Sequence, residues 1–184
     1  MKSEIYSPAE DSYLLAESVQ GFLKKQKDKK IKILDMGSGS GIQAQTCKQL
    51  GFNNILAADI NPEAVKYLKK QKTKAIHSNL FSRISKKQKF NLIIFNPPYL
   101  PADKYDNKPD TTAGKKGYEL IIKFLRQAKS HLDKKGVILL LFSSLSKPKI
   151  IKKQAKDLGY NLNLLNKQKL FFEELYVYEL KINN

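Results

Sequence analysis

The residues best able to do chemistry in this sequence stand where a strand is predicted to end, at Asn96-Pro97-Pro98-Tyr99. The run 89–95 before them has the length and the β-branched and aromatic character of a buried strand, and the two prolines must end it. Each proline fixes its own φ angle and lacks an N–H, so the turn is stiff and its carbonyls are free to accept hydrogen bonds. Asn96 adds a side-chain carbonyl and Tyr99 adds a flat ring. Together they could hold a planar amino group, although Pro-Pro after a strand is more often an ordinary loop.

A second motif, Asp35-Met36-Gly37-Ser38-Gly39-Ser40-Gly41, follows a short strand predicted at 31–35. Glycines spaced by one residue allow positive φ angles and let a ligand approach the main chain. The spacing differs from the Gly-x-Gly-x-x-Gly of dinucleotide-binding proteins, and an acid at the strand end would repel a pyrophosphate and attract an ammonium group. We therefore expect Asp35, Gly37 and Gly39 to contact a zwitterionic, positively charged cofactor such as S-adenosylmethionine.

Polar residues also follow the next two predicted strands. Asp59 ends the strand predicted at 54–58, about twenty residues beyond the glycines, where an acid can accept both hydroxyls of a ribose. After the strand predicted at 73–76, the side-chain carbonyl of Asn79 could meet an adenine amino group, with Leu80 against the ring. Taken alone, Asn79 is explained at least as well as a plain polar loop residue.

Hydrophobic periodicity predicts the elements that must position these residues. Strands alternate with helices predicted at 8–25, 41–50, 61–71, 118–132 and 147–158, and a fifth strand is expected at 137–142. Two final segments, 160–166 and 170–180, can pair as a hairpin. This order predicts an α/β fold with a seven-stranded, mostly parallel sheet, helices on both faces and an antiparallel last strand. Ligands of such sheets lie beyond the carboxyl ends of the strands, where Asp35, Gly37, Asp59, Asn79 and Asn96 all fall.

The first predicted helix has its own start signal. Ser7-Pro8-Ala9-Glu10 fits a capping box, with Ser7 as the N-cap and Pro8 at the first helical position. Complementarity with the helix dipole accounts for Glu10, but it does not require the pair Asp11-Ser12 that follows.

Length and composition predict one cytoplasmic domain over residues 1–184, with a capping helix and linker at 1–30. No apolar run is long enough to span a membrane, and the single cysteine, Cys47, excludes an internal disulfide and a zinc cluster. We expect Cys47 to pack in the core. The segment 100–117 is too long for a passive connection, and we expect it to form a substrate loop.

The net charge of +17 would favour contact with RNA or ribosomes. A plain compositional bias explains it equally well, because nearly all the basic residues are lysine. Arg83 and Arg126 are the only arginines, whereas nucleic-acid interfaces make heavy use of arginine.

Taken in order, the motifs resemble those of class I S-adenosylmethionine-dependent methyltransferases, which have a Rossmann-like fold. More narrowly, Tyr6-Ser7-Pro8-Ala9-Glu10-Asp11-Ser12, the glycine motif, Asp59-Ile60-Asn61-Pro62 and Asn96-Pro97-Pro98-Tyr99 resemble the HemK/PrmC-type glutamine methyltransferases. The likeness spans almost the whole chain and is to their short archaeal and eukaryotic branch. It implies methylation of the glutamine side-chain amide in the Gly-Gly-Gln loop of class 1 peptide release factors, and a small zinc-binding activator subunit as partner.

The resemblance also assigns roles to individual positions. It implies that the cofactor or its neighbourhood is contacted by Ser12, Asp35, Gly37, Asp59, Asn79, Leu80 and Asn96. It implies that the substrate amide is held by Asn96, Pro97, Pro98, Tyr99 and Leu100, with Asn96, Pro97 and Tyr99 acting on the reacting amide.

Two other functions stay open at this point. The same four-residue turn serves any planar NH₂ group, and the charge fits a nucleic acid, so an adenine amino-group methyltransferase acting on RNA or DNA is the main alternative. Such an enzyme would need a base-flipping pocket and usually an added recognition element, which the sequence does not show. A cofactor-binding scaffold without activity, docking on ribosomes or on a partner, is the third interpretation.

Overall fold

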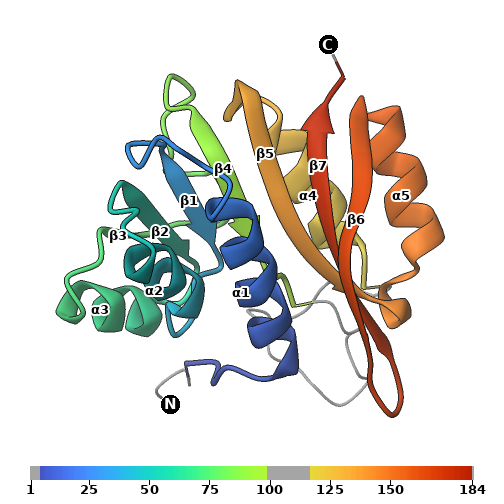
Figure 1. Cartoon of the computed structure of the whole chain (residues 1–184), viewed down its shortest axis with the longest axis horizontal. Helices are drawn as coiled ribbons and strands as arrows, with labels where there is room; N and C mark the ends of the chain where they lie inside the picture. Colours follow the sequence, from blue (N-terminus) through green and yellow to red (C-terminus); the bar gives the residue numbers. More distant parts are fainter. Residues whose placement is uncertain (1–4, 99–116, 184) are drawn as a thin grey trace.

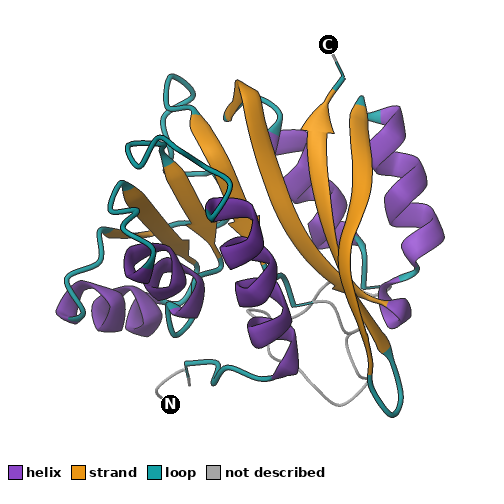
Figure 2. Cartoon of the chain, viewed as in Figure 1, coloured by secondary structure: helices purple, strands orange, loops and turns teal. Residues whose placement is uncertain are grey.

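The structure, a computed structural model, describes residues 5–98 and 117–183 and is built around one seven-stranded sheet with the strand order β3-β2-β1-β4-β5-β7-β6 (Figure 2). Strands β1 to β5 pair in parallel, whereas β7 is antiparallel to both of its neighbours, β5 and β6. The predicted fold class is therefore confirmed. The strands are β1 (Ile33–Met36), β2 (Ile55–Asp59), β3 (Ala75–His77), β4 (Phe90–Phe95), β5 (Leu132–Ser143), β6 (Tyr160–Lys169) and β7 (Glu174–Ile182).

Helices cover both faces of the sheet, as the parallel pairing requires (Figure 1). One face packs against α1 (Glu10–Leu23), α2 (Ile42–Gln49) and α3 (Pro62–Lys70), and the other against α4 (Glu119–Ala128) and α5 (Pro148–Asp157), which follows the short 3₁₀ helix η1 (Ser144–Ser146). Alternate residues of β4 face opposite sides of the sheet. Ile94 packs in the cluster with α1 and α2, and Ile93 packs in the cluster with α4 and α5. Cys47 is fully buried in the α1–α2 layer, which confirms its expected packing role.

The strand register brings the ends of the parallel strands to one level. Met36 pairs with Ala58 on one side and with Phe95 on the other. The residues that follow Met36 and Phe95 therefore leave the sheet side by side, and this is the edge at which the candidate site is built.

Local sequence decides where α3 begins, but it does not decide where α1 begins. The side chain of Asn61 accepts a hydrogen bond from the N–H of Glu63 at 2.9 Å, with Pro62 at the first helical position, as its sequence predicts. The capping box predicted at Ser7 is wrong: α1 begins at Glu10, and its N-cap, Ala9, makes no side-chain cap hydrogen bond.

The start of α1 is shifted by a contact made elsewhere in the fold. The segment before α1 lies over the glycine loop, where the Cβ of Tyr6 would be 3.9 Å from a Cβ placed on Gly39. The Tyr6 hydroxyl then donates to the carboxylate of Asp11 at 3.0 Å. The backbone of Ala9 is extended, so the chain between Tyr6 and α1 is not helical where Tyr6 makes this contact.

Strand β5 begins at Leu132, five residues before its predicted start, and α4 correspondingly ends early, at Ala128. The polar stretch 133–135 carries no strand signal, yet the chain pairs irregularly with the start of β4 there. A Cβ placed on Gly136 would lie 2.8 Å from the main-chain oxygen of Phe90 and 2.9 Å from the main-chain nitrogen of Asp133. Only glycine allows the two strands to approach this closely.

Several predicted features lie outside the described residues. They are Tyr99, Leu100 and the substrate loop predicted at 100–117, of which only Gly117 is described. In the part of the chain that the structure describes, no helix has both the length and the apolar character needed to cross a membrane.

We expect Gly136→Ala to lower the free energy of unfolding by about 1–3 kcal/mol, because the added methyl group meets main-chain atoms that cannot rotate away. Gly21→Ala is the matched control, since nothing lies within 4 Å of its Cβ position on the exposed face of α1. That control should gain roughly 0.5–1 kcal/mol from the helix preference of alanine. Urea unfolding measures both variants, and a Gly136→Ala protein as stable as the wild type would contradict the packing described for β5.

Candidate functional site

Five of the predicted site residues lie at the carboxyl edge of four neighbouring strands, in the order β3, β2, β1 and β4. They are Asn79, Asp59, Asp35, Gly37 and Asn96. A Cβ placed on Gly37, the first residue after β1, would lie 3.3 Å from the ring of Phe95 and 3.9 Å from the main-chain oxygen of Asn96. The glycine loop therefore lies directly beside the Asn-Pro-Pro turn, as the sequence predicts.

The glycine loop is a tight, internally bonded turn between β1 and α2. Gly37, Gly39 and Gly41 have φ angles of +62°, +50° and +84°, which glycine adopts without strain. The N–H of Gly37 donates to the main-chain oxygen of Ala58 at 2.7 Å, and the hydroxyl of Ser38 donates to that of Asp35 at 2.7 Å. These bonds fix the loop against β2.

Asp59 at the end of β2 holds the same loop from the other side. One carboxylate oxygen accepts the N–H of Gly39 at 2.7 Å, and the other accepts the N–H of Asn61 at 2.8 Å. Each oxygen of a carboxylate can accept more than one hydrogen bond, so Asp59 keeps acceptor capacity for hydroxyl groups of a ligand. Its position next to the loop is the one that the ribose prediction requires.

Asp35 lies beneath the glycine loop, almost fully buried. Its carboxylate accepts the N–H of Ala44, in the first turn of α2, at 3.2 Å. The pKa of Asp35 is raised to about 7, chiefly by burial and to a smaller extent by the charge of Asp59, and the hydrogen bonds from Ala44 and Ser38 oppose this rise. Asp35 therefore carries an anion that the fold accommodates poorly unless positive charge comes near.

The turn after β3 holds Asn79 and Leu80 in a strained conformation. Leu80 is buried and has a φ angle of +49°, which is unfavourable for a residue with a side chain. The hydroxyl of Ser78 stabilises the turn by donating to the main-chain oxygen of Leu80 at 2.7 Å. The Asn79 side chain is exposed at the same edge of the sheet.

Asn96 is held in one orientation by Asp11, which lies at the start of α1 and 85 positions earlier in the chain. The side-chain nitrogen Nδ2 of Asn96 donates to Oδ2 of Asp11 at 3.0 Å. A carboxylate has no proton to give, so it must face the NH₂ group of the amide and not its oxygen. The side-chain oxygen of Asn96 consequently points the other way.

That oxygen, Oδ1 of Asn96, is buried and has no hydrogen-bond partner among the described residues. Leaving such a group unpaired costs about 1–3 kcal/mol, so proteins rarely do so without a functional reason. The site thus presents a fixed, unpaired carbonyl oxygen beside the glycine loop.

Sequence reasoning missed Asp11 and Tyr6. The other oxygen of Asp11 accepts bonds from the hydroxyl of Tyr6 at 3.0 Å and from both the N–H and the hydroxyl of Ser12, at 2.6 and 3.2 Å. The predicted cofactor residue Ser12 is itself buried, and its main-chain oxygen accepts from the side chain of Gln43 on α2. One signal in the sequence could have pointed to Asp11. Complementarity with the helix dipole explains Glu10, but it does not require a second acid at position 11.

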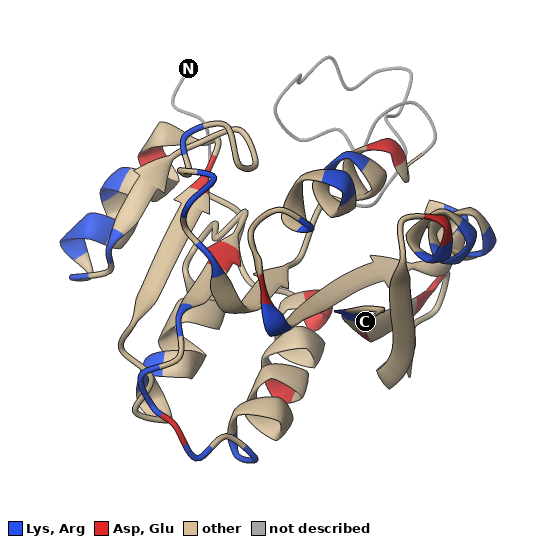
Figure 3. Ribbon diagram, turned by 90° about the horizontal axis from the view of Figure 1, so that it is seen from above, with Lys and Arg blue, Asp and Glu red and all other residues tan. Residues whose placement is uncertain are grey.

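The neighbourhood of Tyr6 is acidic in a chain whose net charge is +17. Partial burial, then the charge of Asp11, and more weakly Glu10 and Glu173, all raise the pKa of the Tyr6 phenol. Figure 3 shows lysines and arginines on several sides of the molecule, with no single basic face. Three carboxylates, those of Glu10, Asp11 and Glu173, therefore act on Tyr6, whose hydroxyl is bonded to the acid that holds Asn96.

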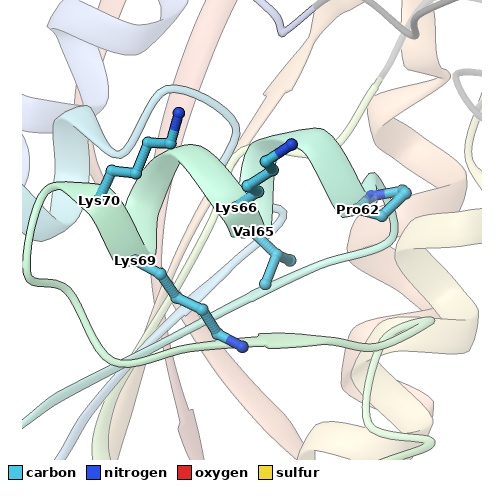
Figure 4. A pocket seen from close by; sticks show the side chains of 5 residues that line it. All are labelled: Pro62, Val65, Lys66, Lys69 and Lys70. Carbon is cyan, nitrogen blue, oxygen red and sulfur yellow. The ribbon is translucent and has the colours of Figure 1, made fainter.

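A hollow of about 490 Å³ lies elsewhere, along α3 (Figure 4). It is lined by Pro62, Val65, Lys66, Lys69 and Lys70, none of which is a predicted site residue. Lysine side chains rim it, and no carboxylate or amide converges on it, so we do not assign it to the reaction.

Of the remaining predicted substrate residues, Pro97 is buried and Pro98 exposed, directly after Asn96. Tyr99 and Leu100 lie outside the described residues.

Comparison with known proteins agrees with this geometry. The family model described as methyltransferase small domain matches residues 12–160. A protein of Methanocaldococcus jannaschii that carries the name "Putative protein N5-glutamine methyltransferase" is 36% identical, and the alignment covers 95% of this chain and 90% of that protein.

Two solved structures share the fold. The E. cuniculi Mtq2-Trm112 complex, described as responsible for methylation of the eRF1 translation termination factor, has a TM-score of 0.78 at 22% identity and covers 97% of this chain and 98% of its own. A T. thermophilus 16S rRNA N2 methyltransferase in complex with AdoMet and guanosine has a TM-score of 0.70 at 18% identity, covering 96% of this chain and 44% of its own. The family model matches most of this chain, and the M. jannaschii relative aligns with nearly the whole of it. The chain therefore belongs to the methyltransferase small domain family.

Proposed function

We propose that this protein is a cytoplasmic enzyme that transfers a methyl group from S-adenosylmethionine to the side-chain amide nitrogen of a glutamine. The proposed substrate is the Gly-Gly-Gln loop of a class 1 peptide release factor. The observation that carries the proposal is the buried, unpaired Oδ1 of Asn96, oriented by Asp11 beside the glycine loop. The names of the M. jannaschii relative and of the Mtq2-Trm112 complex support the choice of substrate.

An amide nitrogen is a poor nucleophile because its lone pair is delocalised, so orientation must do most of the catalytic work. In our proposal Oδ1 of Asn96 and the main-chain carbonyl of Pro97 accept the two N–H bonds of the substrate amide. The nitrogen is then held with its lone pair toward the glycine loop. Such positioning can supply roughly 7–11 kcal/mol of the barrier reduction in favourable cases. Attack by the nitrogen would form the N–C bond and break the bond between the methyl carbon and sulfur, leaving S-adenosylhomocysteine. The methylated amide would then release one N–H proton to water, for which no strong base is needed. Tyr99 and Leu100 complete the substrate site as a sequence prediction.

The cofactor is a good match to the residues present. S-adenosylmethionine, when bound, supplies a methyl group on a positively charged sulfur. Glycines at positions 37 and 39 allow the loop its positive φ angles, and Asp59 next to them has acceptor capacity for ribose hydroxyls. Asp35 places a poorly compensated negative charge beneath the loop. We propose that Ser12, Asn79 and Leu80 complete the cofactor site at its two ends.

The charge distribution argues against the alternative, an adenine methyltransferase acting on RNA or DNA. A nucleic-acid substrate would bring phosphates to the site, and phosphates are normally met by lysine and arginine. The described residues around Tyr6 instead include Glu10, Asp11 and Glu173. RNA or ribosome contact through lysines elsewhere on the surface is compatible with our proposal, but nothing in the site requires it.

We also propose a small zinc-binding activator subunit as a partner. The presence of Trm112 in the complex of the E. cuniculi neighbour supports a second chain. Within the ranges 5–98 and 117–183, no group of three or more His, Cys, Asp or Glu residues is arranged to hold a metal ion, so the zinc in this proposal belongs to the partner.

We expect Asn96→Ala to abolish methyl transfer while leaving the affinity for S-adenosylmethionine within about threefold. The reason is that the variant loses the carbonyl that orients the acceptor, a loss that typically lowers kcat about 10²–10³-fold for a group of this kind. Labelled cofactor and a release factor, assayed with and without the activator, give the rate, and calorimetry gives the affinity. Unchanged turnover would refute the role of Asn96, and labelling of RNA but not of release factor would favour the alternative.

We expect Asp11→Asn to lower kcat on the order of 100-fold with little change in the KM for cofactor, because the Asn96 amide is then free to flip. The change is nearly isosteric and keeps an acceptor for Tyr6 and Ser12. Asp157→Asn, which removes one exposed carboxylate from α5, is the control and should keep full activity. If the two variants behave alike, Asp11 does not position Asn96.

We expect Asp35→Asn to stabilise the cofactor-free protein at neutral pH. The folded-state pKa of Asp35, about 7, is above its ordinary value of 3.8, so in the wild type this group lowers stability progressively as the pH rises from about 4 to 7. The advantage of the variant should therefore be small at pH 4, grow to at most about 4 kcal/mol near pH 7, and change little above that. Thermal unfolding across this range, with Asp28→Asn on the exposed linker as control, tests this expectation. A pH-independent difference would contradict it.

A further inference from the structure

The hairpin between β6 and β7 ends in two exposed phenylalanines. Phe171 and Phe172 are 91% and 85% exposed, more than the other large apolar residues among those described. Their rings contact each other edge to face, with centroids 4.6 Å apart. They occupy the centre of a turn closed by the N–H of Leu170 donating to the oxygen of Glu173 at 2.8 Å. Turns of this kind usually carry Gly, Asn, Asp, Ser or Pro there, so turn geometry does not account for two aromatic residues.

The hairpin tip lies at the edge of the sheet that carries the site. Figure 1 shows the tip extending beyond the carboxyl ends of the parallel strands, on the side where β4 ends. The hairpin is fixed to α1 by the side chain of Asn166, which donates to Glu17 at 3.2 Å, and by Leu170, which packs against the core beneath α1. Because α1 also carries Asp11, the hairpin and Asn96 both contact the same helix.

Charge at the tip is balanced, in contrast to the chain as a whole. Lys167 pairs with Glu174 at 3.4 Å, and the tip carries one further residue of each sign, Lys169 and Glu173. A polyanion such as a nucleic acid would gain little here. Exposed aromatic side chains without excess charge are instead typical of the residues that dominate protein–protein binding.

We propose that Phe171 and Phe172 are a docking contact for the folded protein that carries the acceptor glutamine. This inference rests on the proposed function and adds a second point of attachment to it. The glutamine loop enters the Asn96 site while another part of the same substrate protein covers the two rings. A short peptide containing only the glutamine loop would occupy the first point and not the second.

The test compares two substrates of the Phe171→Ser/Phe172→Ser variant: a folded class 1 release factor and a short peptide carrying Gly-Gly-Gln. We expect kcat/KM for the folded protein to fall roughly 10- to 100-fold, chiefly through KM, as for the loss of an interface hot spot. The kcat/KM of the variant for the peptide should stay within about twofold of the wild-type value. Tyr67→Ser removes an exposed aromatic residue from α3 and should leave both substrates unaffected.

Three outcomes would overturn the docking contact. An equal loss of kcat/KM with both substrates would mean that the two phenylalanines stabilise the hairpin or the site itself. No loss with either substrate would mean that the rings do not contact the substrate protein. A wild-type dimer that the double variant converts to monomer in sedimentation would mean that a second copy of this chain covers the rings. A wild type inactive on both substrates would instead refute the proposed function, and the inference would fall with it.

Discussion

The hydrogen bond from Nδ2 of Asn96 to Oδ2 of Asp11 is the interaction on which the rest of the site depends. An asparagine side chain can present either a donor or an acceptor, and only its surroundings decide which. The carboxylate of Asp11 permits one choice, and that choice directs the unpaired oxygen away from α1. The stiff proline after Asn96 and the buried strand before it fix the backbone, so the acceptor is fully oriented before a substrate arrives.

The electrostatics of the site follow from where its acids are buried. A chain with a net charge of +17 nevertheless places Asp35 beneath the glycine loop, Asp59 beside it, and Asp11 behind Asn96. Each is anchored by main-chain N–H groups, which lowers the penalty for burying a carboxylate but does not remove it for Asp35. The remaining imbalance favours a cationic ligand. The same acids disfavour a phosphate-rich one, which separates the methyl-transfer chemistry from the basic surface elsewhere on the molecule.

Much of this arrangement was predictable, because parallel strands place their carboxyl ends at one edge whatever their loops contain. Asp59 and Asn96 were found from strand ends alone, and the start of α3 from Asn61 and Pro62. The features that were missed all depend on distant contacts. Asp11 meets Asn96 across 85 positions, Tyr6 lies against Gly39 of the glycine loop, and Gly136 lies against Phe90 at the start of β4. Local periodicity contains none of these, since each is decided by tertiary packing.

Substrate specificity can be separated from catalysis in this fold, because different parts of the chain provide them. The sheet edge supplies a glycine loop and an oriented amide, and these suit any flat NH₂ group brought to them. Discrimination between acceptors must therefore come from parts of the chain that lie around the edge but take no part in holding the amide. Among the described residues, the β6–β7 hairpin meets that condition: it is packed on the helix that orients Asn96, yet its phenylalanines face solvent. Changing such a tip alters which molecule docks without disturbing the hydrogen bonds that position its amide.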